Sequence, residues 1–280
     1  MCRLFGFRSV IKSNVHSSLL EADNALLHQS VQHPDGWGVA YYLDDVPHVI
    51  KSVESAVSDS LFKRVGGLVA SETVLAHLRK ATLGKVNVVN THPFQYGRWI
   101  FAHNGNIKDF SKHRDKIFAI IDPSLSKYVL GESDSELLFF CLLSKIKNLI
   151  PLDAVDIPAP MIGTATRSLM AELKAIIGPF NEVVASPQDT YLTFIITNGM
   201  TMLGFQGGQD LNYSTYKSLC PEREDCAFFG TNCESEDPRG IINHLVLASE
   251  RLEGANIFHP MKPGDIVGVD RRMIIYRDKL

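Results

Sequence analysis

The chain has 280 residues, of which 45% are hydrophobic and 21% charged, and its 20 Gly and 13 Pro are no more than average usage. This composition excludes a fibrous or disordered chain, and a chain of this length buries enough surface to fold without disulfide or metal crosslinks. The formal net charge of −3 gives no electrostatic reason to expect a nucleic-acid partner. No apolar run is long enough for a membrane helix, and the first residues lack a signal peptide's apolar stretch, so we expect a cytoplasmic protein.

The first half of the chain favours short strands. We expect a strand through Phe7, a helix over residues 17–31, and a turn at residues 33–36 that leads into a strand over 37–42. Further strands are expected at residues 48–51, 74–78 and 99–103.

Two helices are predicted from clearer signals. Ser133 and Glu136 have capping-box spacing, and Leu138, Cys141, Leu142, Ile146 and Leu149 follow on one face. A second helix is expected to begin at Thr164 as its cap and to end at Gly178-Pro179, after a proline-rich stretch over residues 150–160.

The remaining segments read mostly as strands. We expect these at residues 191–197, 200–205, 244–249, 265–270 and 273–276, and Asn198-Gly199 is a strong hairpin signal between the first two. Many strands joined by tight turns, with helices in a few blocks, indicate an α+β fold with antiparallel sheets.

The five cysteines do not suggest a secreted disulfide framework, because their number is odd. Cys220, Cys226 and Cys233 are separated by five and six residues, whereas zinc sites usually use closer pairs. We therefore interpret them as free thiols and expect no metal site.

Cys2 is the candidate nucleophile. Removal of Met1 would make Cys2 the first residue, and its α-amine, which titrates at about pH 8, could then accept the proton of its own thiol, whose pKa is about 8.5. The alternative interpretation is a buried strand cysteine.

Further motifs accompany Cys2 in a fixed order. They occupy residues 1–6, 35–38, 76–84, 90–94, 99–107 and 131–136. Together they resemble the class II, N-terminal-cysteine glutamine amidotransferases, and most closely the stand-alone, single-domain members. The resemblance is dense to about residue 140, and residues 246–250 and 261–265 look like the closing strands of the stand-alone group.

The resemblance implies a role for each matching residue. Arg79 matches the arginine that binds the α-carboxylate of glutamine, and a guanidinium suits a planar carboxylate. Thr82 matches a position that lines the same pocket. Asn104 and Gly105 match the oxyanion hole, and Asp134 matches the carboxylate that binds the α-ammonium group. Each residue also has a purely structural interpretation. These are a surface charge for Arg79, a loop-stabilising hydroxyl for Thr82, a hairpin turn for Asn104-Gly105, and a helix-dipole partner for Asp134.

His77, His92 and His103 also fall within these motifs. We interpret them as packing and hydrogen-bonding residues, because the implied mechanism already has a base and their scatter is unlike the spacing of metal ligands.

The implied fold is a four-layer αββα sandwich of the N-terminal-nucleophile type, with residues 1–280 forming one glutamine amidotransferase domain. The implied activity is hydrolysis of the γ-carboxamide of glutamine through a γ-glutamyl thioester on Cys2, with no cofactor. Residues 150–280 contain no phosphate-binding Gly-rich loop or nucleotide motif, so any ammonia acceptor would be a separate synthase.

Two alternatives stay open. The chain could hydrolyse another γ-glutamyl amide, of the glutathione or ergothioneine-pathway type, or it could be a non-catalytic glutamine-binding regulatory module, which a blocked Cys2 would favour.

Overall fold

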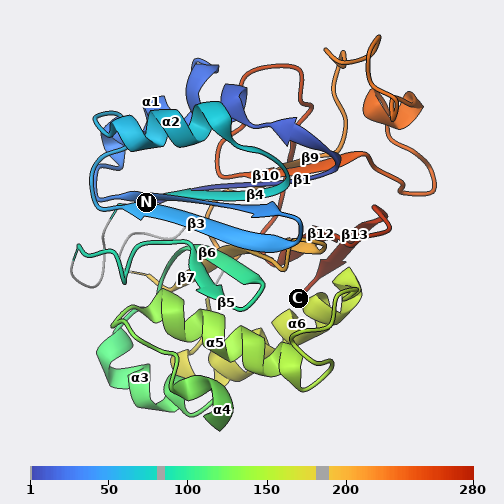
Figure 1. Cartoon of the computed structure of the whole chain (residues 1–280). Helices are drawn as coiled ribbons and strands as arrows, with labels where there is room; N and C mark the ends of the chain where they lie inside the picture. Colours follow the sequence, from blue (N-terminus) through green and yellow to red (C-terminus); the bar gives the residue numbers. More distant parts are fainter. Residues whose placement is uncertain (1, 81–85, 181–188) are drawn as a thin grey trace.

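The computed structural model describes residues 2–80, 86–180 and 189–280, and its strands form two sheets whose neighbouring strands are all antiparallel (Figure 1). Among these residues one sheet has the order β11 (His259–Pro260), β9 (Asn212–Ser214), β10 (His244–Ala248), β1 (Arg3–Asn14), β4 (Ala70–Leu78), β2 (Trp37–Leu43) and β3 (Val46–Ser52). The other has the order β13 (Ile275–Lys279), β12 (Asp265–Val269), β8 (Met202–Phe205), β7 (Tyr191–Thr197), β6 (Trp99–Asn106) and β5 (Phe94–Tyr96).

Helices cover the outer face of each sheet (Figure 1). Over the β1 sheet lie η1 (Ser17–Glu21), α1 (Leu26–Gln29), η2 (Ser30–Gln32) and α2 (Ser60–Leu68). Over the β6 sheet lie α3 (Phe110–Phe118), α4 (Pro123–Ser126), α5 (Asp134–Lys147) and α6 (Ala159–Ile177). A short η3 (Thr231–Cys233) lies in the loop before β10. The predicted four-layer αββα sandwich is therefore confirmed.

Alternating side chains hold the layers together. In β6, Ile100 and Ala102 face the other sheet, whereas Phe101 between them packs on the helices, with its ring 5.3 Å from that of Phe139. In β1, Leu4 faces the other sheet and Phe5 faces the opposite helical layer. This period of two is what a strand buried on both faces requires, because successive side chains point to opposite sides.

The register of the β1 sheet determines what lies beside Cys2. Strand β1 has neighbours on both sides, and Arg3 pairs with Leu78 at the end of β4. Leu78 pairs in turn with Trp37 at the start of β2. The residues just beyond these pairs, Cys2 and Arg79, therefore meet at one end of the sheet.

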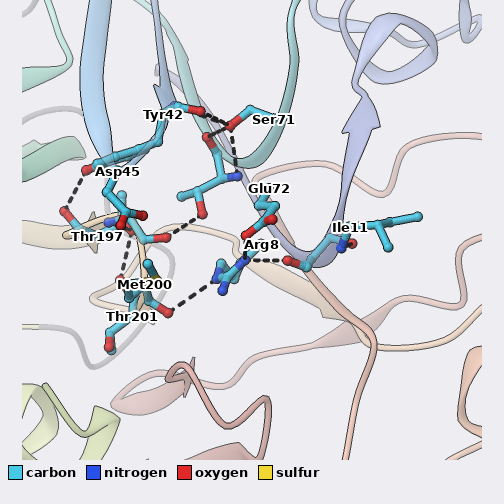
Figure 2. A network of polar contacts seen from close by, with 12 residues as sticks. Arg8, Ile11, Tyr42, Asp45, Ser71, Glu72, Thr197, Met200 and Thr201 are labelled. Carbon is cyan, nitrogen blue, oxygen red and sulfur yellow. Dashed lines mark hydrogen bonds and ion pairs between the residues drawn. The ribbon is translucent and has the colours of Figure 1, made fainter. Parts of the chain in front are cut away.

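A polar network joins the two sheets near the β7–β8 turn (Figure 2). The Arg8 side chain of β1 is buried; its Nε donates to the carbonyl of Met200, in the β7–β8 turn, and its Nη1 lies 3.3 Å from Glu72 Oε2. The Tyr42 hydroxyl of β2 donates to the carbonyl of Thr197 at 3.3 Å. Both contacts cross from one sheet to the other and fix their relative position.

The predicted strands are present, but the one expected over residues 273–276 begins only at Ile275, because Met273 closes a turn at φ 54°. The Asn198-Gly199 hairpin joins β7 to β8, with Gly199 at φ 95°. The single helix expected over residues 17–31 is wrong, because the chain leaves helical geometry at Ala22. Asn24 there donates to the carbonyl of Arg251 and accepts from the amide of Glu253, and these contacts hold the segment in a non-helical path.

The expected start of the second long helix is also wrong. Helix α6 begins at Ala159, with Pro158 as its cap, and Thr164 lies inside it, where its hydroxyl accepts from Arg167. Pro160, in the stretch expected to be a linker, fits the first helical turn, whose amides have no intrahelical acceptor. The predicted end at Gly178 is confirmed. No described helix combines the length and apolarity that crossing a membrane needs.

The network around Arg8 generates a stability prediction. Replacing Arg8 with Ala removes a buried side chain and leaves the partly buried Met200 carbonyl without this donor, so Arg8→Ala should lower the free energy of unfolding by about 2 kcal/mol in urea titrations. The Glu72 side chain is partly exposed, and the amide oxygen of Gln can still accept from Arg8, so Glu72→Gln should lower the free energy of unfolding by less than about 1 kcal/mol. Equal effects of the two substitutions would contradict a bridging role for Arg8.

Candidate active site

Cys2 lies where the two sheets meet. Its backbone nitrogen donates to Asn104 Oδ1 of β6 at 3.1 Å, so the start of β1 is tied to the other sheet. The thiol lies against the backbone of Lys80, 3.3 Å from its amide nitrogen and 3.4 Å from its carbonyl oxygen.

The environment of the thiol acts on its pKa in two directions. Burial raises the pKa of Cys2, and the amide of Lys80 and the charge of Arg79 act against that rise. A thiol in this setting needs a base to form the thiolate near neutral pH, since only the thiolate is an effective nucleophile.

Arg79 follows β4 directly and is 4% exposed. Its amide donates to the Gly36 carbonyl at 2.8 Å, and its carbonyl accepts from the amide of Asp35 at 3.2 Å, so the predicted turn before β2 holds it in place. Gly36 has φ 119°, which is open to glycine and strained for other residues. Burial lowers the pKa of the guanidinium group, and Cys2 and Asp35 act against this.

Asn104 and Gly105 are adjacent in β6 and therefore point to opposite faces of its sheet. Asn104 Oδ1 is used by the Cys2 nitrogen, which leaves its amino group as the end that can donate. Gly105 shares a pocket with Cys2, Arg79 and Asp134. A Cβ at Gly105 would overlap the imidazole of His103, so this position requires glycine.

Asp134 is the first residue of α5 and is 3% exposed. Its carboxylate accepts from the amide of Ile107 (2.8 Å) and from the amide (2.8 Å) and hydroxyl (3.3 Å) of Ser135. Burial raises the pKa of Asp134 to about 6, although these three donors act in the opposite direction. A cation bound beside this carboxylate would favour its charged form.

The local sequence explains how α5 presents Asp134. The Ser133 hydroxyl accepts from the amide of Glu136 at 3.2 Å, which is half of the predicted capping box. Glu136 itself accepts from the amides of Leu130 (3.0 Å) and Gly131 (2.6 Å), so it fixes the preceding loop. The helix therefore starts at Asp134 with its first turn against the end of β6.

The three histidines of the motifs are buried, and His92 and His103 line this pocket. The rings of His77 and His92 lie 4.2 Å apart. Burial lowers the pKa of His77 and of His103 to about 3, so both are neutral near pH 7. His103 Nδ1 lies 2.9 Å from the Ser135 hydroxyl oxygen.

The structure thus brings five of the six predicted site residues together: Cys2, Arg79, Asn104, Gly105 and Asp134. The sixth, Thr82, lies outside the described residues. Cys220, Cys226 and Cys233 line a separate cavity of about 330 Å³ beside the later part of β1. Within the described ranges, no three His, Cys, Asp or Glu side chains are arranged to hold a metal ion.

Lys80 and Ser135 are not among the predicted site residues, and His103 is predicted only to pack and to form hydrogen bonds, as it does with Ser135. Lys80 acts through its backbone, so its side chain carries no signal. A signal for the other two exists: His103 and Gly105 are two residues apart on one strand and share a face, and Ser135 follows Asp134 in the first turn of α5.

Comparison with known families gives a match to the sequence model of "Glutamine amidotransferases class-II" over residues 1–204. Probable glutamine amidotransferase DUG3 of Saccharomyces cerevisiae is 26% identical over 224 residues, which cover 72% of this chain and 62% of that protein. Uncharacterized protein MJ1515 of Methanocaldococcus jannaschii is 37% identical over 154 residues, covering 53% of this chain and 39% of that protein.

A third relative is gamma-glutamyl-hercynylcysteine sulfoxide hydrolase of Mycobacterium tuberculosis, which is 32% identical over 115 residues, covering 38% of this chain and 49% of that protein. The matches thus span about two fifths to three fifths of the length of these curated relatives.

Solved structures share the fold. A glutamine aminotransferase class-II domain protein from Silicibacter pomeroyi superposes with a TM-score of 0.62 at 18% identity, covering 100% of this chain and 99% of that one. Glutamine phosphoribosylpyrophosphate amidotransferase from B. subtilis superposes with a TM-score of 0.58 at 14% identity, covering 99% of this chain and 49% of that one.

The pKa of Asp134 predicts how stability depends on pH. The unfolded chain releases this proton at about pH 4, whereas the folded protein keeps it to about pH 6, so raising the pH between these values favours unfolding. Relative to Asp134→Asn, the wild-type free energy of unfolding should fall by about 3 kcal/mol across this window. Chemical denaturation of both proteins at several pH values measures the difference, and a constant difference would contradict the raised pKa.

Proposed function

Because the chain belongs to the class-II glutamine amidotransferases, we propose that it hydrolyses the γ-carboxamide of L-glutamine through a γ-glutamyl thioester on Cys2. The observation that carries this proposal is the shared pocket of Cys2, Arg79, Gly105 and Asp134. It contains a nucleophile, a cation and an anion, which are the groups that cleavage of an amino-acid amide requires.

Cys2 is the proposed nucleophile and, through its own nitrogen, the proposed base. In the chain as encoded, this nitrogen is the amide of the Met1–Cys2 bond, so the proposal requires removal of Met1. The resulting α-amine accepts the thiol proton, and the thiolate attacks the γ-carbon of glutamine. The hydrogen bond to Asn104 Oδ1 supports this role, because it would hold the amine beside the site.

The attack forms a tetrahedral intermediate whose oxygen carries the negative charge. The Asn104 amino group and the Gly105 amide are the proposed donors to this oxygen. The α-ammonium group of Cys2 then protonates the leaving nitrogen, and ammonia departs as the thioester forms. Water, which loses a proton to the same amine, attacks the thioester and releases glutamate and the Cys2 thiol.

Arg79 and Asp134 are the proposed contacts for the amino-acid end of glutamine. The buried guanidinium group binds the α-carboxylate, and the buried carboxylate binds the α-ammonium group. Thr82 is proposed to line the same pocket. With these contacts, specificity rests on the free γ-glutamyl group rather than on the amine attached to it.

A second candidate is hydrolysis of another γ-glutamyl amide. The mycobacterial relative, whose name states hydrolysis of such a compound, supports it. A third, a non-catalytic glutamine-binding module, would follow if Met1 stayed in place.

The same proposal covers the extent of the domain, its compartment, its cofactor and its partner. Residues 1–280 would form one amidotransferase domain, in the cytoplasm and without a cofactor. A separate synthase that accepts the ammonia is a proposed partner.

Glutamate release decides between the candidates. Protein whose loss of Met1 is verified by intact mass should release glutamate from L-glutamine, whereas Cys2→Ala should release none and Cys220→Ala should match the wild type. A kcat/KM higher for a larger γ-glutamyl amide would favour the second candidate. Full activity of Cys2→Ala would exclude the proposed nucleophile, and an inactive processed protein that still binds glutamine would favour the third candidate.

If Asn104 donates to the oxyanion, replacing it should lower kcat, whereas replacing Asn106 in the same strand should not. Asn104→Ala should lower kcat about 100- to 1000-fold, because a donor to the transition state is lost. Asn106 lies two residues further along the strand and donates to the carbonyl of Asp189, so Asn106→Ala is a matched control. Steady-state kinetics of the two variants measure the contrast, and similar kcat values would contradict the role of Asn104.

A further inference from the structure

His103 and Ser135 connect the strand that carries Gly105 to the helix that carries Asp134. His103 Nδ1 and the Ser135 hydroxyl oxygen lie 2.9 Å apart, and the same hydroxyl donates to Asp134 Oδ1 at 3.3 Å. All three side chains are buried, with exposed fractions of 1%, 5% and 3%. The three side chains form a continuous polar chain from β6 to the first turn of α5.

Ser135 forms two hydrogen bonds to the Asp134 carboxylate. Of the three donors described above for Asp134, its amide and its hydroxyl supply two, and the amide of Ile107 supplies the third. The position of Ser135 therefore determines where the carboxylate points. A displaced serine would lose the hydroxyl contact and alter the aim of the carboxylate at a bound cation.

His103 is wedged between the two ends of the site. Its ring occupies the space where a Cβ of residue 105 would lie, so it packs directly on the backbone of Gly105. Nδ1 of the same ring contacts Ser135. A rigid, planar ring in this place sets the distance from the proposed oxyanion donor to the serine that holds Asp134.

The charge state of His103 suits this position. Burial keeps the imidazole neutral near pH 7, so it neither repels a substrate ammonium group nor neutralises the Asp134 carboxylate. A protonated lysine or arginine at this point would compete with the substrate for that carboxylate.

From this geometry we infer that His103 is a positioning residue, which acts through Ser135 to aim Asp134 at the α-ammonium group of the substrate and so makes the site selective for amides that carry that group. The inference rests on the proposed function for the identity of the substrate. It gives His103 a role beyond packing, and it makes Ser135 the link through which that role is exerted.

The first test compares two amides that differ only in the α-ammonium group. L-Glutamine carries it, and glutaramate has the same carboxylate and amide with hydrogen in its place. His103→Leu fills the space without a hydrogen bond, and should raise KM for glutamine about tenfold with kcat within about threefold of wild type. Hydrolysis of glutaramate should stay within about threefold of wild type, because leucine still fills the space beside Gly105 and the α-ammonium contact plays no part. Loss of activity toward both amides by the same factor would overturn the inference.

Two further variants test whether His103 does more than fill space: a polar replacement of His103, and its combination with Ser135→Ala. His103→Asn retains a polar atom near the position of Nδ1 and should restore KM for glutamine to within about threefold of wild type. Ser135→Ala should reproduce the effect of His103→Leu, and the double variant should be no worse than either single one, because both remove the same link. Additive effects would contradict the link through Ser135, and Ser135→Ala still tests it if His103→Leu does not fold.

A binding measurement separates this inference from the proposed function. Calorimetry measures the affinities of L-glutamate and glutarate, which differ only in the α-ammonium group and are not hydrolysed. If the wild type hydrolyses neither amide but prefers glutamate over glutarate, and His103→Leu removes that preference, the positioning role stands and the hydrolase proposal fails. If the preference is absent or survives in His103→Leu, the positioning role fails.

Discussion

The contact between the Cys2 nitrogen and Asn104 Oδ1 is the interaction on which the site depends. Cys2 directly precedes a strand of one sheet, and Asn104 lies in a strand of the other, so only the packing of the two sheets brings them together. Strand β1 is held by β4 on one side and β10 on the other, which leaves its first residue little freedom to move away. The packing of the two sheets thus holds the start of β1 beside β6.

Strand β6 then distributes the remaining groups. Its alternation directs Asn104 to the face shared with β1, and His103 and Gly105 to the face covered by α5. The first turn of α5 carries Asp134 at the same point. Burial raises the pKa of the Asp134 carboxyl group, so the charged carboxylate lowers the stability of the folded protein. A binding site keeps such a local instability when the ligand supplies the opposite charge.

Much of this arrangement could be predicted from local sequence signals, and the exceptions have physical reasons. The Asn198-Gly199 turn and the α5 cap are short-range features, whereas the grouping of Cys2, Arg79, Asn104-Gly105 and Asp134 into one site came from the resemblance to a known family. The break in the helix expected over residues 17–31 depends on contacts of Asn24 with residues 251–253, more than 220 positions away, which no local pattern contains. The link between His103 and Ser135 likewise exists only once α5 packs on β6.

The central claim is that the Cys2 thiol carries the γ-glutamyl group during turnover. Intact-mass spectrometry of the processed protein, quenched in acid during reaction with L-glutamine, tests it most directly. The account predicts a fraction of the protein with one added γ-glutamyl group, mapped to the peptide that begins at Cys2 and absent from Cys2→Ala. Glutamate release with Cys2 remaining unmodified, or an adduct on another residue, would contradict it.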